Sequence, residues 1–116
     1  MTESEATVTL AIRERETMTV ANGNGPVDAL DKALRKALVP IYPPLESMRL
    51  IDYKVRILTP QAGTEAVTRV MIESSGESGR WTTVGISTNI IDASFNALYD
   101  AITWKLHRAG LMLPAV

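Results

Sequence analysis

TVANGNGPVDALDKAL (residues 19–34) contains a strand-like segment, a glycine-rich turn and an amphipathic segment, and a related stretch occurs later in the chain. The second stretch, TVGISTNIIDASFNAL (83–98), keeps Thr-Val, Asp-Ala and Ala-Leu at the same positions along its length. Upstream of each stretch, EATVTLAI (5–12) is similar to EAVTRVMI (65–72). Two related pairs in the same order indicate an internal duplication.

Hydrophobic periodicity predicts five strands and two helices. Pro26 suits the first position of a helix, because its missing N–H has no helical partner there. Asp28 with Lys32, and Asp31 with Arg35, have the i,i+4 spacing of helical ion pairs. The apolar stripe of the second helix is expected at Ile91, Phe95, Leu98, Ile102 and Leu106. The expected strands are 6–14, 16–21, 49–58, 65–74 and 80–87, and the expected helices are 26–38 and 90–108.

The predicted fold class is α+β, with duplicated strand-strand-strand-helix units, an antiparallel sheet and two helices on one face. We expect a single domain over residues 1–116, with a first repeat unit at about 5–39, a connector at 40–48 and a second unit at about 49–110. Nothing before Glu5 matches RLIDYKVRIL (49–58), so the first unit lacks its leading strand. Either that strand was lost, or the sequence is cut from a longer protein, which explains the abrupt start more simply.

Composition excludes several classes of protein. The chain is 46% hydrophobic and 22% charged, as expected of a globular domain. Its net charge of −1 gives no excess of cations for nucleic acid, and its apolar runs are too short to span a membrane. With no cysteine, disulfides and thiolate metal sites are excluded. A cytoplasmic location is expected.

No motif for catalysis is found. GNGPVDAL has only two glycines of a dinucleotide fingerprint and lacks the GK[ST] of a phosphate loop. His107 lies among cations at a helix end, and as the only histidine it cannot form a metal cluster. Asp28 and Asp92 occupy equivalent helix-start positions, where partnering the helix dipole explains both. The sequence therefore predicts no catalytic residue, no metal and no cofactor.

Binding is the remaining chemistry. Both helix starts present backbone N–H groups that can bind a small carboxylate, and glycine lets a ligand approach the backbone closely. A plain strand-to-helix turn that needs glycine for a positive φ explains the same residues equally well. Both interpretations stay open at this point.

Three segments resemble the C-terminal regulatory domain of the 2-isopropylmalate synthase and citramalate synthase family. They are GNGPVDALDKAL, LIDYKVRILTPQAGTEAVTRVMIES and RWTTVGISTNIIDASFNALYDAI, and the resemblance covers about residues 5 to 108. It implies a homodimeric domain of two strand-strand-strand-helix units that binds the end-product amino acid of a pathway. It also implies that a catalytic TIM barrel lies upstream, so this chain alone is expected to be an inactive part of an acetyl-CoA-dependent acyltransferase.

The segment RWTTVGISTNIIDAS, with Trp81, is more similar to the citramalate synthase branch, whose feedback inhibitor is isoleucine. The 2-isopropylmalate synthase branch is typically closer to STDIIEAS and senses leucine. We therefore favour isoleucine as the effector. A leucine sensor and a purely structural dimerisation module are the alternatives. The expected partners are isoleucine or leucine, a second copy of the chain and the catalytic domain, with no nucleic acid and no membrane.

The family's effector pocket, matched residue by residue, implies binding residues in three places. In a regular strand Leu50 and Tyr53 point to opposite faces, which conflicts with a shared pocket unless the strand starts after Leu50. For Tyr53, Val55 and Ile57 an ordinary sheet core is the alternative. The implied residues are Gly23, Asn24, Gly25, Pro26 and Val27 in the loop, Leu50, Tyr53, Ile57 and Val67 on strands, and Ile91 at the second helix start.

Overall fold

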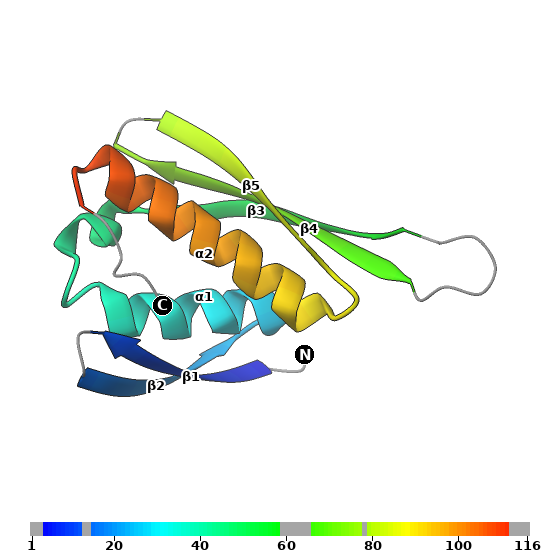
Figure 1. The fold of residues 1–116 in the computed structure, drawn as a ribbon, viewed down its shortest axis with the longest axis horizontal. Coiled ribbons are helices and arrows are strands. Elements are labelled where there is room, and N and C mark those ends of the chain that lie inside the picture. The colour runs from blue at the N-terminus through cyan, green and yellow to red at the C-terminus, as the bar shows by residue number, and fades with distance from the viewer. Residues whose placement is uncertain (1–3, 13–14, 59–65, 78, 112–116) are drawn as a thin grey trace. The chain divides into compact units, whose positions relative to one another are not determined.

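A computed structural model describes residues 4–12, 15–58, 66–77 and 79–111. The chain forms two compact units, one built on β1, β2, α1, η1 and the last residues of α2, and the other on β3, β4, β5 and α2 as far as Trp104. Figure 1 shows the elements along the chain. Their bounds are β1 (Ser4–Ile12), β2 (Arg15–Gly23), α1 (Pro26–Leu38), the 3-10 helix η1 (Pro43–Ser47), β3 (Arg49–Leu58), β4 (Val67–Gly76), β5 (Gly79–Ser87) and α2 (Ile90–Arg108).

The predicted α+β class is confirmed. The strands form two antiparallel sheets, β1-β2 and β3-β4-β5, and each unit has a long helix. The predicted bounds of both helices and of β3 match the structure, and the ends of the other strands differ by at most two residues. In the described part of the chain, no helix is both long and apolar enough to cross a membrane.

In the first unit, α1 packs against β1 and β2. Val8 on β1 lies opposite Thr19 on β2, and the Thr19 hydroxyl donates to the Ala33 carbonyl of α1 at 2.7 Å. Because Val8 is buried and Thr19 bonds the helix, this face of the hairpin is the covered one. The buried stripe of α1 consists of Val27, Ala29, Leu30, Ala33, Leu34, Ala37 and Leu38.

Only one of the two expected helical ion pairs is formed. Lys32 pairs with Asp28 at 3.1 Å. Arg35 instead donates from Nη2 to the carbonyls of Leu45 and Glu46, at 3.3 and 3.4 Å, and makes no ion pair with Asp31 within the described residues. The prediction of an Asp31–Arg35 pair is therefore wrong, because Arg35 binds the backbone of η1 instead.

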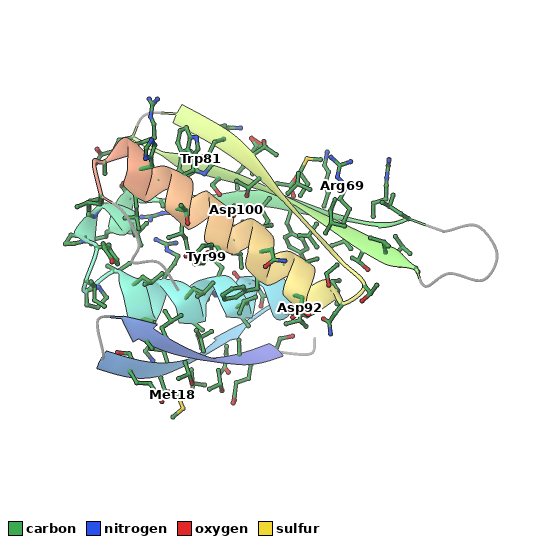
Figure 2. All side chains as sticks on the ribbon, viewed as in Figure 1. Met18, Arg69, Trp81, Asp92, Tyr99 and Asp100 are labelled. Atoms are coloured by element: carbon green, nitrogen blue, oxygen red, sulfur yellow. The ribbon has the colours of Figure 1, made fainter. Side chains whose placement is uncertain are left out.

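In the second unit, α2 lies against β5 through small residues. The Thr83 hydroxyl donates to the Ala97 carbonyl at 2.7 Å, and Trp81 Nε1 donates to the Ala101 carbonyl at 3.2 Å (Figure 2). Trp81 also stacks on Trp104, with ring centroids 4.6 Å apart. A Cβ atom at Gly85 would overlap the backbone of α2 at the carbonyl of Ala93.

The apolar stripe expected on α2 is only partly buried. Leu98, Ile102 and Leu106 are buried and Phe95 is half-buried, but the side chain of Ile91 is 46% exposed. The closest approach to β5 is made by Ala93, Ala97 and Ala101, because small side chains let a helix lie close to a sheet.

Candidate functional site

The last residue of β2 must be glycine, because the backbone of α1 comes close to position 23. A Cβ atom at Gly23 would lie 2.5 Å from the Ala29 amide nitrogen and 2.6 Å from Asp28 Oδ2. Among the described residues, positive φ occurs at Gly79 and Gly110 and not in this loop. The alternative that this turn uses glycine for a positive φ is therefore wrong, and close approach is the physical reason for Gly23.

Helix α1 begins without a side-chain cap. Its N-cap, Gly25, is extended with φ −175° and offers no side chain to the first turn. Asp28 Oδ2 turns back to accept a hydrogen bond from the amide of Asn24 at 3.1 Å. The first amides of α1 consequently have no capping side chain and retain the positive end of the helix dipole.

Helix α2 begins differently, although the two starts are equivalent in the duplication. Asn89 is the counterpart of Gly25 in the second repeat, and its Oδ1 accepts from the amides of Ile91 and Asp92 at 2.7 and 3.3 Å. These bonds satisfy the donors that a small carboxylate would otherwise use. The α2 start is therefore less suited to bind an anion, and Ile91 is a part of this capped turn.

A β-bulge at Ile51 changes the faces of β3. Leu50 lies opposite Ser74 and Asp52 lies opposite Glu73, so β3 advances two residues where β4 advances one. Beyond the bulge, Tyr53 lies opposite Ile72 and Ile57 opposite Thr68. Since directly opposite residues of antiparallel strands share a face, and Ser74, Ile72 and Thr68 alternate along β4, Leu50, Tyr53 and Ile57 lie on one face.

This face of β3 is uncovered. It is the face against which α2 lies at β5, because Tyr53, Ile72 and Thr83 are aligned across the three strands. Tyr53 and Val55 are 41% and 40% exposed and Ile57 is 66% exposed, so they are not an ordinary sheet core. We call Leu50, Tyr53, Val55 and Ile57 the β3 apolar stripe. Val55 was not among the expected binding residues. It lies two residues from both Tyr53 and Ile57, and this alternation indicates that it shares their face.

The other expected residues fall in different environments. Val67 lies opposite Leu58 and therefore on the face away from the stripe. In the loop, Asn24 and Pro26 are exposed and Gly25 is half-buried, whereas Val27 is buried in the first unit. The structure thus brings the loop residues together at the start of α1, and Leu50, Tyr53 and Ile57 together on β3, but it does not place Val67 with either group.

The site has little titratable chemistry. Burial raises the pKa of Asp31 on α1 to about 6, and this outweighs the positive charge of the nearby Arg35, which lowers the pKa. Among the described residues, no three histidine, aspartate or glutamate side chains gather where they could hold a metal ion. The β3 stripe offers apolar contact, which suits an aliphatic group. The start of α1 offers backbone N–H donors, which suit a small anion.

Comparison with known proteins assigns the family. Residues 1–106 match the family described as the LeuA allosteric (dimerisation) domain. The chain belongs to this family. The resemblance inferred from the duplicated motifs is thereby confirmed, and so is the assignment as an allosteric and dimerisation domain.

Several relatives of this LeuA-type domain are named synthases. The chain is 51% identical over 106 residues to the (R)-citramalate synthase of Geobacter sulfurreducens, covering 91% of this chain and 20% of the relative. It is 54% identical over 103 residues to the (R)-citramalate synthase of Aquifex aeolicus, covering 89% and 20%. It is 42% identical over 105 residues to the 2-isopropylmalate synthase of that organism, covering 89% and 18%. The chain thus spans about a fifth of the length of these relatives.

Proposed function

We propose that this LeuA-type domain is the feedback sensor of a citramalate synthase and that its effector is isoleucine. The β3 apolar stripe carries the proposal, because three of the expected binding residues lie there on one uncovered face. The relatives support the citramalate branch, since in Aquifex aeolicus the citramalate synthase is 54% identical to this chain and the 2-isopropylmalate synthase 42%.

The stripe suits a branched aliphatic side chain. Tyr53 presents a large ring and Ile57 a β-branched side chain, and both are exposed in the chain by itself. Burying an aliphatic group against them is favourable by about 0.8 kcal/mol for each CH₂ removed from water. Such an apolar surface separates isoleucine from valine only weakly, because one methylene in an apolar pocket changes binding by about 1–3 kcal/mol. Isoleucine and leucine are isomers and differ only in the shape of the side chain.

The start of α1 suits a carboxylate. Its first amides have no capping side chain, and the helix dipole favours an anion there. We propose the loop from Gly23 to Pro26 as a contact for the carboxylate of an effector, to be tested by a variant of this loop alone. Because Val27 is buried, its contribution is through its backbone amide.

In the proposed mechanism the effector acts on the synthase indirectly. Isoleucine binds one conformation of the dimeric domain more tightly and thereby biases the catalytic part of the enzyme toward a less active state. The chain itself contributes no catalytic group and is proposed to be inactive alone. Leucine sensing in a 2-isopropylmalate synthase is the second candidate, and dimerisation without any effector is the third.

Titration calorimetry of the 116-residue chain with isoleucine, leucine and valine tests the proposal. We expect saturable binding with isoleucine bound most tightly. Tyr53→Ala removes the largest ring of the stripe and is expected to weaken isoleucine binding by about tenfold or more. Lys54→Ala is the matched control, because Lys54 adjoins Tyr53 on the strand and lies on the opposite face.

The outcomes separate the three candidates. Tighter binding of leucine than of isoleucine would favour the 2-isopropylmalate branch. An absence of heat with all three amino acids at millimolar concentration would leave dimerisation as the function. Equal loss of binding in Tyr53→Ala and Lys54→Ala would contradict the assignment of the site to the stripe.

A further inference from the structure

One end of the β3-β4-β5 sheet carries a group of three cations on the face opposite to the β3 apolar stripe. Arg56 on β3 lies directly opposite Arg69 on β4, and Lys54 lies directly opposite Met71, the next residue on that face. Figure 2 shows Arg69 pointing away from α2. We call Lys54, Arg56 and Arg69 the basic cluster.

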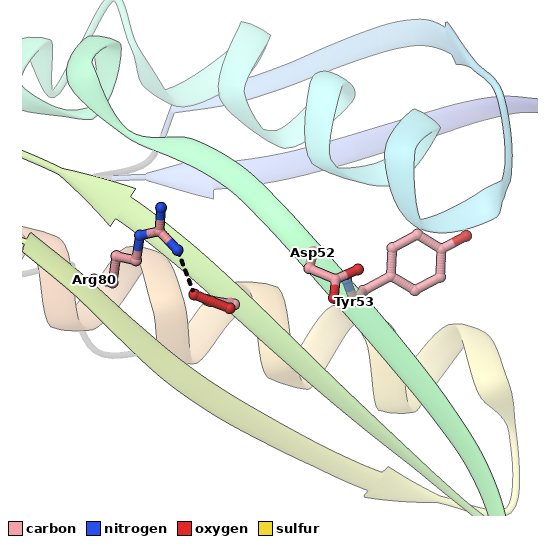
Figure 3. A network of polar contacts seen from close by, with 4 residues as sticks. Asp52, Tyr53 and Arg80 are labelled. Carbon is pink, nitrogen blue, oxygen red and sulfur yellow. Dashed lines mark hydrogen bonds and ion pairs between the residues drawn. The ribbon is translucent and has the colours of Figure 1, made fainter.

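Two arginines directly opposite each other repel, and such a pair destabilises a sheet unless an anion lies between them. Within the described residues, no carboxylate forms an ion pair with any member of the basic cluster. The other end of the same face differs, because Arg80 on β5 pairs with Glu73 on β4 at 3.3 Å (Figure 3). Among the described side chains, an ion pair thus forms at Arg80 but at no member of the basic cluster, although Asp52 lies on the same face beside Lys54.

The basic cluster surrounds a hollow. A volume of about 460 Å³ is lined by Lys54, Arg56 and Arg69 together with Val55 and Met71. This volume is in the range of small-molecule sites. The cations can bind an anionic group while the Met71 side chain offers an apolar contact, so the hollow suits a ligand that has both parts.

We propose that the basic cluster binds a phosphate-type anion, such as the phosphate or pyrophosphate group of a small metabolite. Three cations match a group with a charge of about −2 better than a single carboxylate, and a phosphate ester carries about −1.5 to −2 at neutral pH. The planar guanidinium groups of Arg56 and Arg69 each bind phosphate oxygens in a bidentate manner. The site is separate from the proposed isoleucine contacts and does not depend on them.

Titration of the 116-residue chain with sodium pyrophosphate at low ionic strength tests this site. We expect saturable binding that weakens as salt is added, and a higher midpoint of thermal unfolding in the presence of pyrophosphate. The double variant Arg56→Gln/Arg69→Gln is expected to bind at least about tenfold more weakly, because it loses two charge-assisted contacts. It is expected to remain folded by circular dichroism, since it removes a repulsive pair.

Arg80→Gln is the matched control, because Arg80 lies on the same face but is already paired with Glu73. We expect its affinity for pyrophosphate to stay within about twofold of the wild type. Equal weakening in Arg80→Gln, or no saturable binding to the wild-type chain, would overturn the proposal. Binding of a polyglutamate peptide in place of pyrophosphate would overturn it in favour of an acidic protein partner.

Discussion

The starts of the two helices in this duplicated chain make equivalent backbone hydrogen bonds but differ in their N-caps. In both, a threonine hydroxyl binds a helix carbonyl at 2.7 Å, from Thr19 to Ala33 and from Thr83 to Ala97. In both, an alanine amide closes the first turn at 3.0 Å, although Gly25 accepts it in α1 and Asn89 in α2. The difference shows that the strand-to-helix contact was retained after duplication while the loop chemistry diverged. Of the two starts, it is α1 that lacks a capping side chain.

The largest expected effect concerns how closely each helix lies on its sheet. Gly85 is the counterpart of Ala21 in the first repeat. Gly85→Ala places a Cβ against the backbone of α2, so we expect a loss of about 3–5 kcal/mol in the free energy of unfolding, measured by chemical denaturation. Ala21→Gly, its matched control, is expected to cost at most about 1 kcal/mol. Comparable losses of stability in both variants would contradict the claim that α2 lies closer to its sheet at Gly85 than α1 does at Ala21.

The next effect concerns Asp31, whose equivalent in the second repeat is Phe95. Because burial raises the pKa of Asp31 from 3.8 to about 6, the folded chain binds this proton more tightly than the unfolded chain. The stabilisation from protonation is present below pH 3.8 and is lost as the pH rises through 6, so this residue makes the chain less stable at pH 7 than at pH 4. At 1.36 kcal/mol for each pKa unit the difference is at most about 3 kcal/mol.

Asp31→Asn removes this dependence. We expect the variant to be more stable than the wild type at pH 7, and its free energy of unfolding to change less between pH 4 and 7. Denaturant titrations at several pH values measure both. Parallel pH curves for the variant and the wild type would show that another group determines the dependence.

The smallest expected change in stability comes from exchanging the N-cap residues of the two helices. Asn89→Gly removes the two bonds to the first turn of α2 and is expected to cost a few tenths to about 1 kcal/mol of stability. Gly25→Asn gives α1 a capping side chain and is expected to raise stability by a similar amount, and to weaken isoleucine binding by occupying the uncapped amides. Calorimetry with isoleucine distinguishes the variants. If Gly25→Asn binds isoleucine as tightly as the wild type, the start of α1 does not contact the carboxylate.

The sequence predicted the helices well because their signals are local. Pro26 at the start of α1 and the basic last turn of α2 both lie where helix ends prefer them. The duplication was also visible in the sequence, where Thr-Val occurs at 19–20 and at 83–84. In the structure, Thr19 and Thr83 make equivalent hydrogen bonds to a helix carbonyl.

The faces of β3 could not be predicted in the same way. The alternation from Ile51 to Ile57 is regular, and no glycine or proline marks the bulge. The bulge depends on pairing with Ser74 and Glu73 on another strand. The exposure of Tyr53 also depends on tertiary structure, because alternation predicts which residues share a face but not whether a helix covers it. Arg35 was assigned to Asp31 because the carbonyls of η1 cannot be placed from local spacing.

The most direct test is an amide NMR spectrum of the isotopically labelled 116-residue chain, recorded during titration with isoleucine. The sensor assignment predicts saturable shifts for the amides of Gly25, Leu50, Tyr53 and Ile57, with little change at the capped amides of Ile91 and Asp92. The absence of saturable shifts, or shifts that occur at the α2 start and not at β3, would contradict it.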